Sequence, residues 1–291
     1  MDESGMKYVT LSDLMRTLRT QFYKVPHDVD FVLGVPRSGL LAAVPLAEWL
    51  NVPCVDVDSF CSGAAPTGGR RLAYHSDSGR SKPRVLVVDD TIFNGGSMAA
   101  VREKLRPLDG WYDFIFMAVY LEGPCTAVDV WLEDVRQYAD PFVLYEWNIY
   151  HHTPRIMSRC IYDIDGVLCV DPPDERDTDA YVQYIQRPVP LFVPTQEIGE
   201  IVTYRLAAYE HITRRWLADA GVRYKTLTMF PAQTYGARQS SGIGPSAFKA
   251  DIYAQREWAR LFVESSDRQA REIYERTGKA VLCVESNKMY S

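Results

Sequence analysis

The chain has 291 residues, of which 47% are hydrophobic and 24% charged, a balance typical of a folded protein with one large or two medium domains. A formal net charge of −6 without a long run of like charges gives no support to binding of nucleic acid or an anionic membrane. The six scattered cysteines indicate neither a disulfide framework nor a zinc site, and no apolar run has the length of a signal peptide or membrane span, so we expect a cytoplasmic protein.

Strand-like runs alternate with helical patterns along the chain, and this alternation predicts an α/β protein with parallel sheets. In chain order, the predicted strands cover residues 31–35, 84–90, 114–121, 159–166, 200–204, 260–265 and 280–285. The predicted helices cover residues 38–50, 95–108, 205–221 and 267–278. A join near 150–159 separates two blocks of strand and helix, from which we predict two domains, 1–155 and 156–291.

The first pattern of polar residues follows the second predicted strand. In RVLVVDDTIFNGGSM, Asp89 and Asp90 end the apolar run and precede a turn rich in Gly and Ser. Backbone N–H groups of such a turn can bind phosphate, because the glycines at 95–96 allow close approach and Thr91 and Ser97 add hydroxyl donors. The carboxylates would repel a phosphate, and they suit the vicinal hydroxyls of a sugar, directly or through Mg²⁺. The alternative is a strand that ends in two solvated acids and a common Gly turn.

This stretch resembles the phosphoribosyl-pyrophosphate (PRPP) signature of the type I phosphoribosyltransferases, and the upstream run GVPRSG (34–39) resembles the family's pyrophosphate-binding loop. The resemblance implies transfer of ribose 5-phosphate from PRPP to a base-like acceptor, with Mg²⁺-bound pyrophosphate leaving. Asp89 and Asp90 would then be catalytic, since they suit the ribose hydroxyls and the developing positive charge. The implied PRPP-binding residues are Arg37, Ser38, Gly39, Asp89, Asp90, Thr91, Phe93, Asn94, Gly95, Gly96 and Ser97.

Two further segments are interpreted through the same resemblance. The segment 59–83, rich in Gly, Ser and Pro, resembles the family's flexible catalytic loop, with cationic side chains available for the pyrophosphate at Arg70, Arg71, Arg80 and Lys82. The acceptor base is usually held by a hood from the ends of the domain, here 1–28 and 122–152. Trp147 is the candidate for stacking on the base, although packing at a domain seam explains an aromatic residue there equally well. The family also contains members that keep the site only for regulation, and a homodimer is the default expectation by resemblance.

The second pattern of polar residues is RCIYDIDGVLC, in which Asp163 and Asp165 follow an apolar strand and precede Gly166. One carboxylate at such a position can attack phosphorus, while the other protonates the leaving oxygen and later activates water. Mg²⁺ would neutralise the crowded negative charge. A calcium loop or chance could produce the same four residues.

This pattern resembles the first motif of the haloacid dehalogenase (HAD) superfamily of phosphohydrolases. The resemblance implies that Thr203, at the predicted end of a strand, is the phosphate-binding hydroxyl and that Lys249 is the lysine that offsets charge. Lys225 competes for this role, but YKTLTM has the pattern of a strand, which favours Lys249. The implied metal ligands are Asp163, Asp165, Glu264 and Asp267, and which acid of the last two contacts metal directly is left open.

Together the two resemblances predict two parallel-sheet, Rossmann-like domains: a type I phosphoribosyltransferase fold, then a HAD fold whose insertion at 171–197 is short for a cap. We expect a bifunctional enzyme that makes a nucleotide from PRPP and dephosphorylates a phosphoester, conceivably that nucleotide, to give a nucleoside-like product. The alternative is a PRPP-sensing domain that regulates a phosphatase acting on an unrelated phosphoester. A regulator or repair factor that acts on nucleic acid is disfavoured by the acidic composition.

Overall fold

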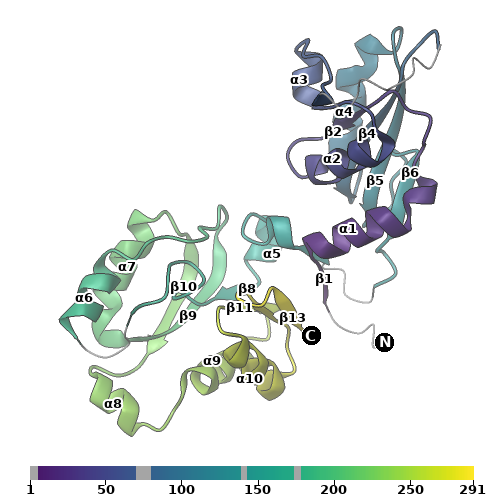
Figure 1. Cartoon of the computed structure of the whole chain (residues 1–291). Helices are drawn as coiled ribbons and strands as arrows, with labels where there is room; N and C mark the ends of the chain where they lie inside the picture. Colours follow the sequence, from purple (N-terminus) through teal and green to yellow (C-terminus); the bar gives the residue numbers. More distant parts are fainter. Residues whose placement is uncertain (1–5, 70–79, 139–142, 174–177) are drawn as a thin grey trace. The chain divides into compact units, whose positions relative to one another are not determined.

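The computed structural model describes residues 6–69, 80–138, 143–173 and 178–291, which form two compact units (Figure 1). The N-terminal unit covers Val9–Val143, and the C-terminal unit covers Leu144–Ser291 together with the N-terminal residues up to Tyr8. The strands β1 (Lys7–Val9) and β7 (Val143–Tyr145) pair where the chain passes between units.

This division differs from the predicted boundary at 155/156, because residues 144–155 group with the C-terminal unit. Tyr145 is buried, and the hydroxyl of the buried Tyr162 donates a hydrogen bond to the carbonyl of Ile149 at 3.1 Å. The predicted pair of domains stays a prediction, and each unit is described by itself.

The N-terminal unit is built on a five-stranded parallel sheet in the order β3-β2-β4-β5-β6. Its strands are β2 (Phe31–Gly34), β3 (Cys54–Asp56), β4 (Arg84–Ile92), β5 (Asp113–Leu121) and β6 (Val130–Asp134). Its helices are α1 (Leu11–Thr20), α2 (Gly39–Leu50), α3 (Val57–Cys61) and α4 (Gly96–Leu105), with 3₁₀ turns η1 (Phe22–Lys24) and η3 (Arg106–Leu108). In the register, Gly34 lies opposite Val88, so the chain leaves β2 and β4 at the same edge of the sheet.

Strand β4 lies at the centre of this sheet and explains the uninterrupted apolar run in the sequence. Val85 and Val87 lie in one hydrophobic cluster, and the alternate residues Leu86 and Val88 are also fully buried. A parallel strand covered on both faces requires apolar residues at every position. The predicted end at residue 90 was wrong: β4 continues to Ile92, because Leu121 of β5 still offers it a partner.

The C-terminal unit is built on a six-stranded sheet in the order β10-β9-β8-β11-β12-β13. Its strands are β8 (Cys160–Tyr162), β9 (Ile198–Leu206), β10 (Tyr224–Phe230), β11 (Leu261–Glu264), β12 (Val281–Cys283) and β13 (Lys288–Tyr290). Its helices are α5 (Pro154–Met157), α6 (Asp179–Gln186), α7 (Glu210–Asp219), α8 (Tyr235–Ser240), α9 (Pro245–Ala254) and α10 (Asp267–Thr277), with 3₁₀ turns η4 (Glu146–Asn148) and η5 (Ala207–Tyr209). The central strand β8 has β9 and β11 as its neighbours, so residues that follow these strands share one edge.

The predicted α/β class is confirmed, but this second sheet is not purely parallel. Strand β13 pairs antiparallel with β12. Only residues 284–287 separate the two strands, which is too short for a crossover and long enough for a hairpin. Thr203 also differs from its predicted place, because it lies inside β9, which continues to Leu206 before α7 begins at Glu210.

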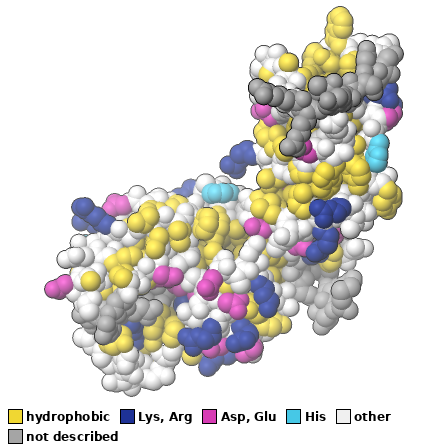
Figure 2. Space-filling model, viewed as in Figure 1, with side chains coloured by type: hydrophobic (Ala, Val, Ile, Leu, Met, Phe, Trp, Pro, Cys, Tyr) yellow, Lys and Arg dark blue, Asp and Glu magenta, His cyan; other side chains and the backbone are white. Residues whose placement is uncertain are grey.

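On the face drawn in Figure 2, acidic side chains of the C-terminal unit lie among its basic ones. Within the described part of the chain, no helix has both the length and the apolar character that crossing a membrane requires.

Candidate functional site

The first candidate site lies at the shared edge of β2 and β4. The hydroxyl of Ser38 donates a hydrogen bond to Oδ1 of Asp90 at 2.8 Å, which links the loop after β2 to the acid pair. A Cβ at Gly39 would lie 2.6 Å from the carbonyl oxygen of Val88 and 3.1 Å from Cα of Asp89. The close approach of α2 to β4 therefore requires glycine, and it brings the two predicted PRPP motifs together.

The two acids of this site are buried side by side. Asp89 is 6% and Asp90 4% exposed, and Asp89 accepts a hydrogen bond from the backbone N–H of Asp90 at 3.0 Å. Burial and the neighbouring carboxylate of Asp90 raise the pKa of Asp89 to about 8. Hydroxyl donors or positive charge brought by a ligand would stabilise the ionised form, so the pair is suited to a sugar.

The turn after β4 leads directly into helix α4. Gly95 has φ +78° and caps the helix, where a Cβ would lie 2.6 Å from Sγ of Cys125. Oδ1 of Asn94 accepts the backbone N–H of Gly96 at 3.0 Å. The first-turn N–H groups of a helix have no partner within the helix and attract anions, so the start of α4, which includes Ser97, is suited to a phosphate.

The remaining PRPP-binding predictions have different surroundings. Thr91 is half-buried within β4, while Phe93 is 60% exposed and Arg37 is exposed. Arg70 and Arg71 lie outside the described residues. Two other predicted cations are engaged within their own unit: Arg80 forms an ion pair with Asp28, and Lys82 donates to the carbonyl of Asp109 at 2.9 Å.

Trp147, the predicted base-stacking residue, belongs to the C-terminal unit. Its ring lies 5.0 Å from the ring of Tyr145 with an interplanar angle of 40°, and the side chain is half-buried. Packing against Tyr145 therefore accounts for this residue without a ligand, and its role in stacking stays a prediction.

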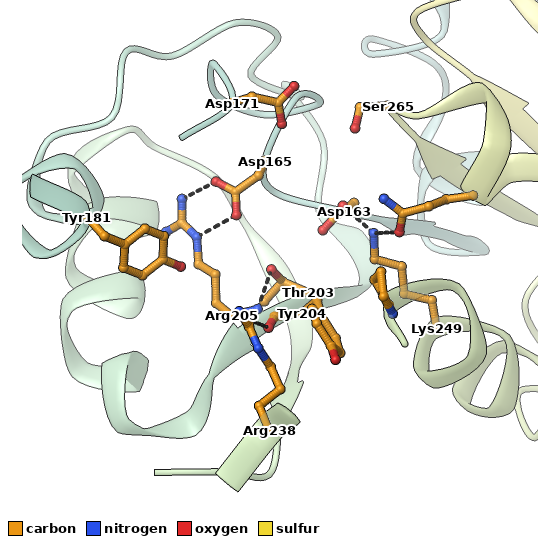
Figure 3. A pocket seen from close by; sticks show the side chains of 12 residues that line it. Asp163, Asp165, Asp171, Tyr181, Thr203, Tyr204, Arg205, Arg238, Lys249 and Ser265 are labelled. Carbon is orange, nitrogen blue, oxygen red and sulfur yellow. Dashed lines mark hydrogen bonds and ion pairs between the residues drawn. The ribbon is translucent and has the colours of Figure 1, made fainter. Parts of the chain in front are cut away.

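The second candidate site is a cavity at the carboxyl ends of β8 and β9 (Figure 3). Asp163 directly follows β8, and Thr203 reaches the cavity from β9. The lining residues are Asp163, Asp165, Asp171, Tyr181, Thr203, Tyr204, Arg205, Arg238, Pro245, Lys249, Ser265 and Gln269. The structure thus brings four of the predicted phosphatase residues to one cavity.

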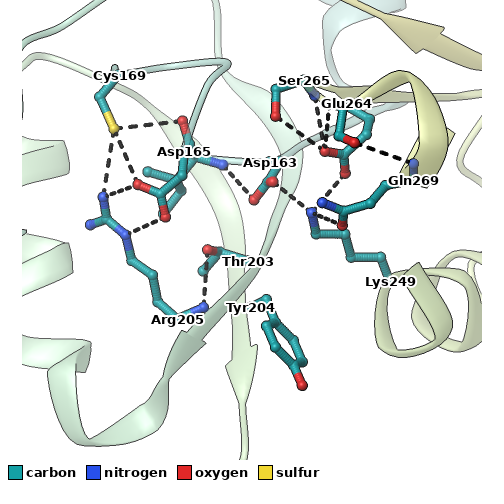
Figure 4. Close-up of polar contacts among 12 residues, drawn as sticks. Asp163, Asp165, Cys169, Thr203, Tyr204, Arg205, Lys249, Glu264, Ser265 and Gln269 are labelled. Atoms are coloured by element: carbon teal, nitrogen blue, oxygen red, sulfur yellow. Dashed lines mark hydrogen bonds and ion pairs between the residues drawn. The ribbon is translucent and has the colours of Figure 1, made fainter. Parts of the chain in front are cut away.

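Lys249 of α9 organises one side of this cavity (Figure 4). Its Nζ donates to Oδ2 of Asp163 at 2.6 Å, to Oε2 of Glu264 at 2.7 Å and to Oε1 of Gln269 at 3.0 Å. Burial raises the pKa of Asp163 to about 7 against the opposing charge of Lys249. Lys225, the other lysine considered for this role, is exposed on β10 and does not line the cavity.

Arg205 organises the other side through a bidentate ion pair with Asp165. Its Nη2 donates to Oδ1 at 2.6 Å and its Nε to Oδ2 at 2.9 Å (Figure 4). Sequence reasoning missed Arg205, although a signal was present: it lies two residues after Thr203, and alternate residues of a strand lie on the same face.

The four predicted metal ligands are not gathered into one site. Glu264 is fully buried and accepts hydrogen bonds from Lys249 and from the backbone N–H of Ser265. Asp267 accepts from the hydroxyls of Ser286 at 2.6 Å and Tyr290 at 2.8 Å, and it does not line the cavity. Among the described residues, no group of three or more acids, histidines or cysteines is arranged to hold a metal ion. In this arrangement the predicted set does not fit Mg²⁺, because Lys249 and Arg205 bind three of its carboxylates and Asp267 does not line the cavity.

Several lining residues carried no usable signal in the sequence. Tyr181 comes from the helix within the 171–197 insertion, and Arg238 comes from α8, which no predicted element covered. Arg238 is buried, and its Nη1 donates a hydrogen bond to the carbonyl of Tyr204 at 2.8 Å. Its Cζ lies 4.5 Å from the centre of the Tyr204 ring. Tyr181 and Arg238 reach the cavity through the tertiary packing of α6 and α8, which the local sequence pattern does not reveal.

Comparisons with known proteins find sequence similarity to phosphoribosyltransferases. No protein-family model matches the chain. The adenine phosphoribosyltransferase of Acaryochloris marina is 34% identical over 116 residues, which cover 36% of this chain and 63% of that protein. That of Ureaplasma parvum serovar 3 is 31% identical, with 28% of this chain and 53% of that protein covered, and that of a Cyanothece species is 29% identical, with 47% and 84% covered.

Two solved structures complete the comparison. The purine phosphoribosyltransferase of Pyrococcus horikoshii is 22% identical with a TM-score of 0.34, covering 49% of this chain and 93% of that one. An orotate phosphoribosyltransferase of Aeropyrum pernix is 22% identical with a TM-score of 0.33, covering 44% and 74%. The chain spans only 53–63% of the length of the first relatives in sequence. The sequence similarities nevertheless support a type I phosphoribosyltransferase domain within this chain.

Proposed function

We propose that the N-terminal unit binds PRPP and transfers its ribose 5-phosphate to a base-like acceptor. The observation that carries this proposal is the hydrogen bond from Ser38 to Asp90, which joins the two motifs that the resemblance assigns to pyrophosphate and ribose phosphate. Similarity to adenine phosphoribosyltransferases makes adenine the first acceptor to test.

In this reaction a nitrogen of the acceptor bonds to C1 of the ribose, while the bond from C1 to pyrophosphate breaks and its electron pair leaves with the pyrophosphate. Mg²⁺ is expected to accompany the pyrophosphate as part of the substrate. Asp89 and Asp90 would accept hydrogen bonds from the ribose hydroxyls and stabilise the positive charge that develops on the sugar. The start of α4 would bind the 5′-phosphate.

For the C-terminal unit we propose phosphoester hydrolysis of the HAD type. A carboxylate oxygen of Asp163 attacks phosphorus and the bond to the leaving oxygen breaks, while Asp165 in its protonated form gives its proton to that oxygen. Water then attacks the aspartyl phosphate, Asp165 takes a proton from this water, and orthophosphate leaves. Support comes from Lys249, which lies 2.6 Å from Asp163 and would offset charge between the nucleophile and the phosphate. Thr203, whose hydroxyl lines the cavity, would donate to a phosphate oxygen.

A transferase joined to a phosphatase suggests a sequence of two steps, from base to nucleotide and from nucleotide to nucleoside. Removal of the phosphate would draw the reversible first step forward. The experiment incubates purified protein with PRPP, Mg²⁺ and a panel of acceptors headed by adenine, and follows pyrophosphate and orthophosphate separately in wild type and Asp163→Asn. We expect pyrophosphate release in both proteins and orthophosphate release with nucleoside formation only in wild type. Absence of pyrophosphate release with every acceptor would overturn the transferase proposal.

One observation favours a second function, in which the N-terminal unit senses PRPP and regulates the phosphatase. The expected acceptor-holding hood includes residues 144–152, which group with the C-terminal unit and not with the PRPP motifs. A change in the rate of phosphoester hydrolysis on addition of PRPP, without release of pyrophosphate, would identify this sensor. Release of pyrophosphate that depends on an acceptor would exclude it.

A further inference from the structure

Arg205 is an unusual residue within the phosphatase cavity, because one of its nitrogens is buried without a hydrogen-bond partner among the described residues. The side chain is 1% exposed, and Nη1 has no hydrogen-bond partner among the described residues, although the residue lines the cavity. A buried charged donor without a partner loses its hydration and gains no hydrogen bond in return, which is unfavourable. Such a cost is consistent with a group that is reserved for a ligand.

The partner that Arg205 does have is the acid on which the proposed hydrolysis depends. Both oxygens of Asp165 accept hydrogen bonds from Arg205, and Figure 3 shows the guanidinium reaching Asp165 beside the ring of Tyr181. Oδ1 also lies 3.4 Å from the hydroxyl of Tyr184 and 3.6 Å from Sγ of Cys169. Because both oxygens of Asp165 are bound to Arg205, neither is available to give a proton to a leaving group. We therefore interpret this contact as the resting state of the cavity.

A second arginine–carboxylate pair in the same unit, in which only the acid is fully buried, shows what a structural arginine is like. Arg256 binds Glu200 with the same bidentate geometry, at 2.7 Å and 3.1 Å, and Glu200 is 1% exposed. Neither residue lines the phosphatase cavity, and the Arg256 side chain is 29% exposed. The two pairs thus match in geometry and differ in their access to the cavity.

We propose that Arg205 is a phosphate-binding residue that exchanges Asp165 for the phosphoryl group of the substrate. A phosphate presents the same planar pair of oxygens to a guanidinium as a carboxylate does, so it can replace Asp165 in the bidentate contact. Nη1 gains a partner in the exchange. Asp165 is released toward the leaving oxygen only when a phosphate is present, and there it takes up from solvent the proton that it then gives to that oxygen. Phosphate binding is thereby coupled to the acid that completes hydrolysis.

This inference rests on the proposed phosphatase, and its test measures binding separately from turnover. Orthophosphate is titrated calorimetrically into wild type, Asp165→Asn, the double variant Asp165→Asn with Arg205→Ala, and Glu200→Gln, all as the full chain. An asparagine cannot accept both hydrogen bonds of the guanidinium, so Asp165→Asn frees Arg205. We expect Asp165→Asn to bind orthophosphate about tenfold more tightly than wild type, and the double variant to lose this gain.

Glu200→Gln is the matched control, because it disrupts an equivalent pair outside the cavity, and we expect its orthophosphate affinity to equal that of wild type. Any orthophosphate bound by the N-terminal unit is common to all four proteins. Hydrolysis of p-nitrophenyl phosphate by wild type is measured in parallel. Hydrolysis without a gain in affinity in Asp165→Asn overturns the exchange and leaves the phosphatase intact. A gain in affinity without hydrolysis of any phosphoester supports the role of Arg205 and overturns the phosphatase.

Discussion

The acid pair of the N-terminal unit, Asp89 and Asp90, differs from Asp163 and Asp165 of the C-terminal unit in what lies beside it. Each acid of the second pair is bound by a buried cation, Lys249 or Arg205. Asp89 has the carboxylate of Asp90 beside it, which together with burial raises its pKa, and a hydroxyl from Ser38 donates to Asp90.

Because of this difference, the two acid pairs suit ligands of different charge. Cations built into the C-terminal cavity offset its carboxylates, so an anionic phosphoryl group can approach a carboxylate nucleophile without full repulsion. The N-terminal pair offers carboxyl oxygens that suit sugar hydroxyls, and a sugar that becomes positive during reaction would favour ionisation of both acids. Four substitutions test this difference between the two acid pairs.

The largest effect is expected from Lys249→Met, which removes the cation shared by Asp163 and Glu264. Two buried carboxylates would lose their partner, and we expect the free energy of unfolding of the C-terminal unit to fall by about 3–5 kcal/mol. Urea denaturation measures it. The control is Lys225→Met on the exposed face of β10, with an expected change within about 0.5 kcal/mol. Equal unfolding midpoints for the two variants would show that Lys249 does not neutralise the pair.

Next in size is Gly39→Ala, which places a Cβ 2.6 Å from the carbonyl oxygen of Val88. Because the clash is with backbone, α2 must shift away from β4 and separate the two PRPP motifs. We expect PRPP affinity to fall by about tenfold or more, in line with the cost of overpacking. Gly110→Ala, where a Cβ would meet nothing within 4 Å, is the control. Unchanged PRPP binding in Gly39→Ala would show that PRPP binding does not depend on the close approach of the two motifs.

The third prediction concerns pH and Asp89. Its pKa is raised from 3.8 to about 8, so between these values the folded state retains a proton that the unfolded state has lost. Stability from this group is therefore present at low pH and is lost as pH rises through this window. We expect Asp89→Asn to flatten the decline in thermal stability between about pH 5 and pH 8 and to weaken PRPP binding. The exposed Asp109→Asn serves as control, and a slope identical to wild type in both variants would contradict the assignment.

The smallest effect is expected from Ser38→Ala, which removes the hydroxyl that donates to Asp90 at 2.8 Å. Loss of this one hydrogen bond is expected to cost about 1 kcal/mol, seen as PRPP binding weakened by about fivefold in a direct titration. Ser62→Ala, whose exposed hydroxyl donates to the carbonyl of Asp58, is the control. If the two variants bound PRPP equally well, Ser38 would not position the acid pair.

Local pattern by itself determined the α/β class, most of the strands and the helices α2, α4, α7 and α10. The apolar run before Asp89 indicated a strand covered on both faces, and α10 ends at Gly278 with φ +63°, as its sequence indicated. These features follow from side-chain periodicity and backbone preference, which act over a few residues. Motif spacing likewise located Asp163 and Lys249, which lie 86 residues apart and meet at 2.6 Å.

Only the tertiary structure decided which groups neutralise one another. The pairing of Arg205 with Asp165 depends on β9 lying beside β8, and the diversion of Asp267 to Ser286 and Tyr290 depends on the hairpin that follows β12. The contacts of a charged side chain are set by whichever strands and loops become neighbours, and the energy of each contact depends on burial. Neither quantity is encoded in local spacing, so the sequence named the acids and Lys249 but not the partners of Asp165 and Asp267.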